Sequence, residues 1–319
     1  MKITNLALFF IIIVCCFMVQ SDVKADNLQA VTNKQILYKQ GLDNAVDDAV
    51  MSLVEVDSSR QLVINKESCV NNFYQSLYSS FGIRTDKKLQ EQLKAYIPVI
   101  LIIDEDGYYI RYNDLNVVDG VKVFQQNWTE KRPYAYEDND LIYSFTLSDY
   151  VKLYNKNTKE LREVKYQDMA ANYPEKDILV DPARFDEVRR NTIVNSIIDD
   201  MKYYINRHNR IAQHYGISYN FALPYIQQED WYRTINDVGM MVIFQGYPYG
   251  GYTIDTFNQY SFAGARIRKT NYYYIAVGTD GKTYYHKDDC GLVTDMSFPY
   301  YSKKDCALEG AWPCPECNP

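Results

Sequence analysis

The stretch YHKDDC at residues 285–290, followed by PCPECNP at residues 313–319, decides how the C-terminal end of this chain folds. The first segment carries an H-x3-C pair, His286 and Cys290, and the second carries a C-x2-C pair, Cys314 and Cys317. One imidazole and three thiolates form a complete tetrahedral ligand set for zinc. The segment between these two stretches is long enough to form a small sheet and a helix that bring the two pairs together. We therefore expect His286, Cys290, Cys314 and Cys317 to bind one zinc ion.

Two other uses of the cysteines stay open at this point. A C-x2-C pair alone is also typical of a redox centre or a disulfide, whereas the additional H-x3-C pair favours a metal. Cys306 lies in residues 303–310, which are expected to form a short helix ending at Gly310. Cys306 can replace one of the four ligands, but a small buried side chain suits its place better.

The same segment resembles a known family. Residues 281–290 (GKTYYHKDDC) and 307–319 (ALEGAWPCPECNP) resemble the metal-binding domain of the Ada DNA-repair protein. They resemble still more closely the stand-alone copies of that domain at the C-termini of secreted and membrane-bound bacterial proteins. The resemblance implies metal binding by His286, Cys290, Cys314 and Cys317. Four protein ligands leave no open position, which implies a structural role. His286 stands where Ada has its methyl-accepting cysteine, so the repair chemistry is not implied.

The N-terminus carries a second signal. Residues 6–19 (LALFFIIIVCCFMV) are an uncharged apolar run of the length of a signal-peptide core. Counted from Ile3 the run is long enough for a thin or tilted membrane span. We expect residues 3–19 to anchor a single-pass protein in the cell membrane with its C-terminus extracellular. The alternative is secretion after cleavage near Ala25, where small residues flank Lys24.

An amphipathic helix is expected directly after this run. Over residues 28–56 apolar side chains recur at i, i+3 and i+4, including Leu42, Val46 and Val50. An apolar N-terminal helix that continues into an amphipathic one resembles the layout of bacterial minor pilin-like surface proteins. That resemblance implies assembly with other surface or secretion components. The alternative is a signal peptide followed by an ordinary surface helix.

Composition limits what the rest of the chain can do. The 319 residues include 47% hydrophobic side chains, which supports a packed core, and 31 tyrosines. A net charge of −7 argues against a nucleic-acid partner. Helices are expected at residues 67–81 and from Pro182 to about residue 214, and a hairpin is expected at Asp106-Gly107 between two β-rich runs. Neither a nucleophile-elbow motif nor an H-E-x-x-H motif occurs.

These signals together predict an α+β protein in three parts. Residues 1–26 are expected to be the anchor or signal peptide, residues 27–270 an α+β extracellular domain, and residues 271–319 the Ada-like metal-binding module. The favoured function is that of a non-enzymatic, membrane-anchored bacterial surface protein with a structural zinc module, working in a surface or secretion assembly. The alternative is a secreted hydrolase with an acidic active site in the Tyr-rich middle domain.

Overall fold

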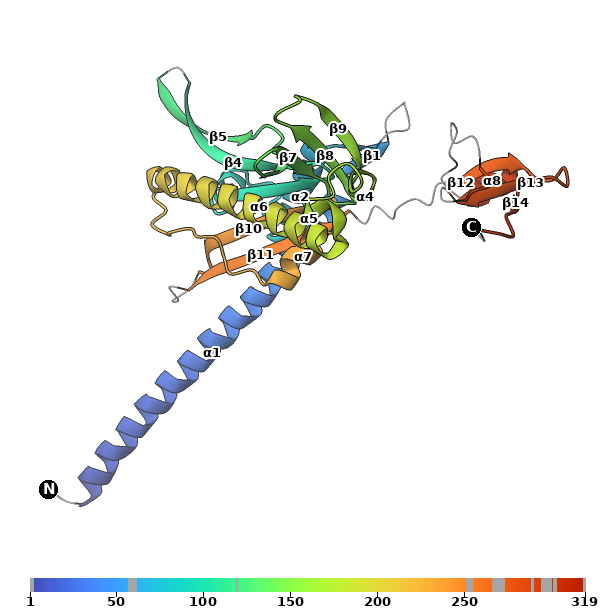
Figure 1. Cartoon of the computed structure of the whole chain (residues 1–319). Coiled ribbons are helices and arrows are strands. Elements are labelled where there is room, and N and C mark those ends of the chain that lie inside the picture. The colour runs from blue at the N-terminus through green and yellow to red at the C-terminus, as the bar shows by residue number, and fades with distance from the viewer. Residues whose placement is uncertain are drawn as a thin grey trace. The chain divides into compact units, whose positions relative to one another are not determined.

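The chain forms two compact units. The computed structural model (Figure 1) describes residues 3–56, 62–118, 120–250, 255–265, 273–287, 290–293, 300 and 303–317. The units are Met1–Ala265 and Arg266–Pro319. Both helices and sheets are present, which confirms the α+β class.

Helix α1 (Ile3–Val50) joins two segments that the sequence treats separately. It continues through Ala25 without a break, so the apolar run and the amphipathic segment form one helix. Its C-terminal half packs into the core: Leu42, Ala45, Val46 and Ala49 are fully buried, as their spacing predicts. The helix ends earlier than expected because residues 54–56 form strand β1 (Val54–Val56), which pairs with β2 (Leu62–Ile64).

The N-terminal half of α1 corrects the expected localisation. Apolar side chains are exposed from Phe10 to Val19, and polar residues begin at Gln20. Within the described part of the chain, no helix is long and apolar enough to cross a membrane. The expectation of a single-pass cell-membrane protein with an extracellular C-terminus is therefore wrong.

A five-stranded antiparallel sheet forms the centre of the first unit. Its strand order is β11-β10-β3-β4-β5. The strands are β3 (Val99–Asp104), β4 (Gly107–Val118), β5 (Val121–Trp128), β10 (Gly239–Pro248) and β11 (Thr256–Gly264). Strands β3 and β4 form the expected hairpin, with Asp104 opposite Gly107. Every residue of β3 is buried, which explains why its sequence is a continuous apolar run instead of an alternating one.

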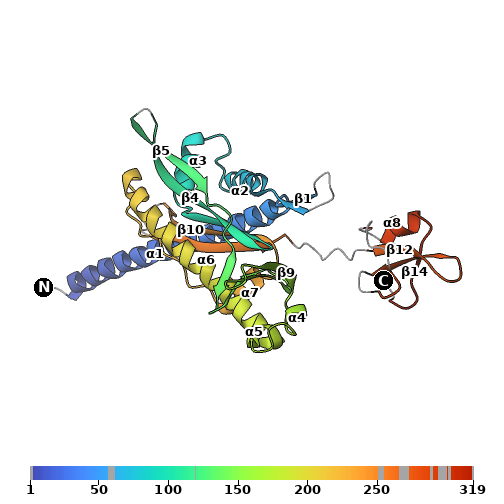
Figure 2. The same cartoon turned by 45° about the horizontal axis from the view of Figure 1, so that its top comes forward.

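Helices cover this sheet on both faces (Figure 2). The C-terminal half of α1 packs on β10 and β11, and α2 (Lys66–Ser80) packs against α1. Helix α3 (Lys87–Lys94) follows α2 in the chain. The long helix α6 (Pro182–Ala212) packs on β3 and β4. It begins at the expected proline, continues as a short 3-10 helix, η1 (Gln213–Tyr215), and stops at Gly216, whose φ of +72° favours glycine.

A second sheet completes the first unit. It is an antiparallel meander of four strands in the order β6-β7-β8-β9. Its strands and the remaining helices of the unit are β6 (Tyr134–Glu137), β7 (Leu141–Phe145), β8 (Tyr150–Asn155), β9 (Leu161–Lys165), α4 (Tyr166–Met169), α5 (Asp177–Val180) and α7 (Gln228–Thr234). Phe185 of α6 packs on Phe145 and Tyr166, so α6 serves both sheets.

The second unit is a small sheet with one helix. Its strands β12 (Tyr273–Val277), β13 (Thr283–Lys287) and β14 (Trp312–Pro313) lie in the order β12-β13-β14. Strand β12 pairs antiparallel with β13, and β14 pairs parallel with β13. Helix α8 (Lys303–Leu308) contains Cys306, as the sequence predicts. Gly310 follows the helix with a φ of +79°.

Candidate metal centre

The parallel pairing of β13 and β14 brings the two sequence motifs together. Tyr285 lies opposite Pro313, so His286 and Cys314 leave adjacent strands at the same level of the sheet. The Cys314 amide donates a hydrogen bond to the Tyr285 carbonyl at 3.1 Å, which fixes this register. Residues far apart in sequence thereby deliver one motif each to the same end of the sheet.

Each motif is completed close to its strand. The Cys290 amide donates to the Lys287 carbonyl at 3.1 Å, and this bond holds Cys290 near His286. Residues 315–317 form the turn that places Cys317 beside Cys314. A C-x2-C spacing suits such a turn because two sulfurs can then reach one ion.

The four predicted side chains form one compact cluster. The candidate ligand atoms of His286, Cys290, Cys314 and Cys317 all lie within 4.8 Å of one another. Nδ1 of His286 is 3.3 Å from Sγ of Cys290. The histidine and two of the cysteines are buried, and Cys317 is half-buried. Among the described residues this is the one His, Cys, Asp and Glu group placed to hold a metal ion.

The local electrostatics favour a thiolate at Cys314. Burial alone would raise the pKa of this thiol, but backbone amides of Cys317 and Glu316 donate to its sulfur, and its pKa is lowered overall. Burial beside Cys290 and Cys314 raises the pKa of Cys317 to about 11. Three thiols this close cannot all ionise unless a cation compensates their charge, which is what a bound metal ion does.

His286 is prepared to bind metal as a neutral imidazole. Burial lowers its pKa, although the negative charge of Glu316 opposes the shift. The neutral ring is the form that coordinates a metal ion. Next to it, Lys287 Nζ donates to the Cys317 carbonyl at 3.1 Å and ties the ligand-bearing turn to β13. No sequence motif indicated this lysine, because only the fold brings it to Cys317.

The other cysteine and histidine candidates lie outside the cluster. Cys306 is fully buried and packs with Tyr273, Tyr285 and Ala311, so it has the structural role that the sequence favoured. His208 is buried in the first unit, where its ring bonds to Asn113 and to the Ala95 carbonyl.

Comparison with known proteins identifies no similar protein. No protein-family model, no curated protein and no solved structure matches this chain. The Ada-like and pilin-like resemblances are therefore not confirmed by comparison. What the structure does support is a cluster of one histidine and three cysteines that is compatible with a zinc site.

Proposed function

We propose that the second unit is a structural zinc module, with His286, Cys290, Cys314 and Cys317 as its ligands. The observation that carries this proposal is the convergence of the four side chains within 4.8 Å. A set of one nitrogen and three sulfurs suits tetrahedral zinc, and four protein ligands leave no position for a substrate or water. The proposed role is therefore to stabilise the fold.

Metal content of the full chain tests this proposal. The purified protein should contain about one equivalent of zinc, and Cys314→Ser should remove it. Cys306→Ala is the matched control, because Cys306 is an equally buried cysteine outside the cluster. Full zinc content in Cys314→Ser would contradict the ligand assignment, as would a disulfide between cluster cysteines in the protein as isolated.

We also propose that the chain works in a non-enzymatic assembly with other protein chains through the N-terminal half of α1. The side chains of Phe10, Ile11, Ile12, Ile13 and Val14 are between 37% and 67% exposed, and five consecutive helical residues point in all directions around the axis. A helix that is apolar on all sides is stable when it is enclosed by other apolar surfaces. Neighbouring helices of further chains would supply that enclosure.

Light scattering of the full chain tests the assembly role. The wild-type protein should form oligomers, and replacing Ile13 and Phe17 by glutamate should yield monomers with an unchanged fold. The matched control is the pair Val117→Glu and Val123→Glu, exposed apolar residues of the β4–β5 hairpin. A monomeric wild-type protein, or equal dissociation by both pairs, would contradict assembly through α1.

A further inference from the structure

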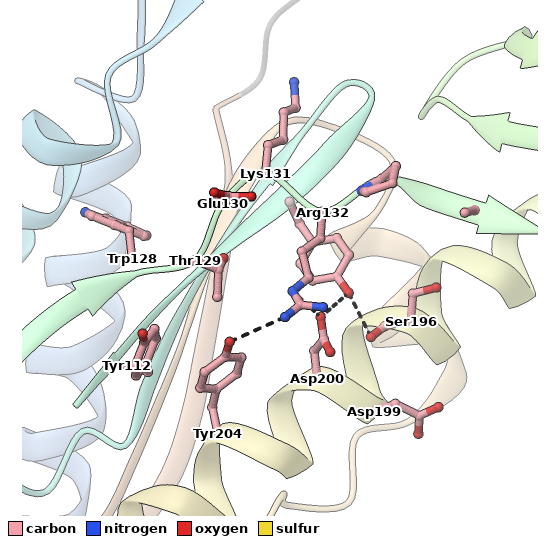
Figure 3. A pocket seen from close by; sticks show the side chains of 13 residues that line it. Tyr112, Trp128, Thr129, Glu130, Lys131, Arg132, Ser196, Asp199, Asp200 and Tyr204 are labelled. Atoms are coloured by element: carbon pink, nitrogen blue, oxygen red, sulfur yellow. Dashed lines mark hydrogen bonds and ion pairs between the residues drawn. The ribbon is translucent and has the colours of Figure 1, made fainter. Parts of the chain in front are cut away.

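The first unit contains an open cleft of about 770 Å³, in the range of roughly 300–1,000 Å³ that is usual for small-molecule sites (Figure 3). One wall is α6, and the other is the chain that leaves β5 at Trp128 and crosses toward β6. Strand β4 contributes Tyr108 and Tyr112 to its lining. Neither the zinc module nor the apolar half of α1 contributes to it.

An arginine is held in a fixed orientation inside this cleft. Nε of Arg132 lies 3.0 Å from a carboxylate oxygen of Asp200. Its Nη2 lies 3.5 Å from the hydroxyl of Tyr204. The Tyr108 hydroxyl donates to the same Asp200 carboxylate at 2.7 Å, so Asp200 is itself fixed. The Arg132 side chain is still 46% exposed, and its Nη1 makes no bond to a described residue.

Two tyrosine hydroxyls add further donors to the cleft that contains this arginine. The rings of Tyr112 and Tyr204 lie 4.4 Å apart, and Figure 3 shows the Tyr204 hydroxyl pointing to Arg132 with Tyr112 on the far side of Tyr204. The Tyr204 oxygen accepts from Arg132, which leaves its hydrogen free to donate. The Tyr112 hydroxyl makes no hydrogen bond to a described residue. Burial raises the pKa of Tyr112, so this hydroxyl keeps its proton at neutral pH.

The acidic groups of the cleft do not cancel these donors. Asp200 is engaged by Arg132 and Tyr108, and Figure 3 shows Asp199 turned away from Arg132. Glu130 and Asp199 are exposed, so water and salt screen their charges. The nearby carboxylates nevertheless favour a singly charged planar ligand group over a doubly charged phosphate.

We propose that this cleft binds a small organic molecule through a carboxylate group. The free N–H groups of Arg132 would hold the carboxylate, and the Tyr112 and Tyr204 hydroxyls would complete its hydrogen bonds. A planar carboxylate matches the guanidinium fork, and charge-assisted bonds of this kind are the strong ones. This inference is independent of the zinc site, because its residues all belong to the first unit.

Ligand-observed NMR with the full chain tests the proposal, with benzoate, benzamide and phenyl phosphate as probes. Benzoate should bind saturably, and benzamide, its neutral analogue of the same shape, should bind at least about tenfold more weakly. Phenyl phosphate should bind less tightly than benzoate. Equal binding of benzoate and benzamide, or no saturable benzoate binding up to about 10 mM, would overturn the proposal.

Three variants test the same site, because two are expected to weaken benzoate binding and one to strengthen it. Arg132→Gln should weaken benzoate binding about tenfold or more, and Tyr112→Phe, which removes only an unpartnered hydroxyl, should weaken it several-fold. Glu130→Gln should strengthen it about twofold at low salt, because it removes an exposed like charge. Tyr225→Phe, at a residue 87% exposed, is the matched control and should have no effect. Weaker binding in Glu130→Gln, or an equal loss in Tyr225→Phe, would show that the cleft does not select a carboxylate.

Discussion

Removing the metal from the full chain should unfold the second unit and leave the first unit folded. The buried side chains of the second unit form two small clusters. One consists of Cys290, Val293 and Cys314, so two of its three members are proposed ligands. Without a metal, this cluster retains little apolar packing and holds thiols that compete for protons.

The expected size of the effect follows from these residues. Among the described residues of the unit, the largest buried apolar side chains are Tyr273, Tyr285 and Val293. Burial of each contributes about 1.5–3 kcal/mol, or roughly 5–9 kcal/mol together. A structural zinc ion contributes about 10–16 kcal/mol to the folding of a small module at neutral pH. The metal term is therefore larger than the apolar one, and a unit of this size without it should not stay folded.

Hydrogen exchange read by mass spectrometry, before and after EDTA treatment, measures this directly. Amides of β12, β13 and α8 should lose protection, and those of β3 and β10 should keep it. Added zinc should restore the protection. Loss of protection throughout both units would show that they share one core, and unchanged protection in β13 would show that the metal is not structural. Either result would refute the reasoning.

Three further outcomes are expected. Burial lowers the pKa of His208 from 6.5 to about 4, so the unfolded chain binds a proton at this residue more readily than the folded chain. The free energy of unfolding should therefore fall by about 3 kcal/mol as the pH drops from 6.5 to 4. His208→Gln should flatten this part of a curve of unfolding free energy against pH. Leu42→Ala, at a fully buried position of α1, should lower the urea-derived unfolding free energy by about 2–5 kcal/mol, whereas Leu28→Ala, at a 72% exposed position, should change it by less than about 0.5 kcal/mol. Limited proteolysis should cleave the second unit of Cys314→Ser and spare that of Cys306→Ala; equal cleavage would assign both cysteines the same role.

Local patterns predicted much of the fold. The spacing of Leu42, Val46 and Val50 identified the buried face of α1, and Pro182 and Gly216 marked the two ends of the α6 region. These signals are reliable because the periodicity of a helix and the residues that begin and end it depend only on neighbours in the sequence. The prediction of a membrane span was wrong because an apolar run in the sequence does not by itself determine what surrounds the helix.

Long-range pairing could not be predicted in the same way. The sequence contains the His286–Cys290 and Cys314–Cys317 motifs, but the parallel register of Tyr285 with Pro313 that joins them leaves no periodic pattern. The cleft around Arg132 was missed for a similar reason. Its donors come from β4, from the chain after β5 and from α6, and no short motif connects them.

The central claim, that one zinc ion is held by one imidazole and three thiolates, is tested most directly by the X-ray absorption spectrum of the zinc-loaded full chain. We expect a first shell of one nitrogen near 2.0–2.1 Å and three sulfurs near 2.3 Å. A shell dominated by oxygen or nitrogen, or one with only two sulfurs, would contradict the assignment of His286, Cys290, Cys314 and Cys317 as the ligands.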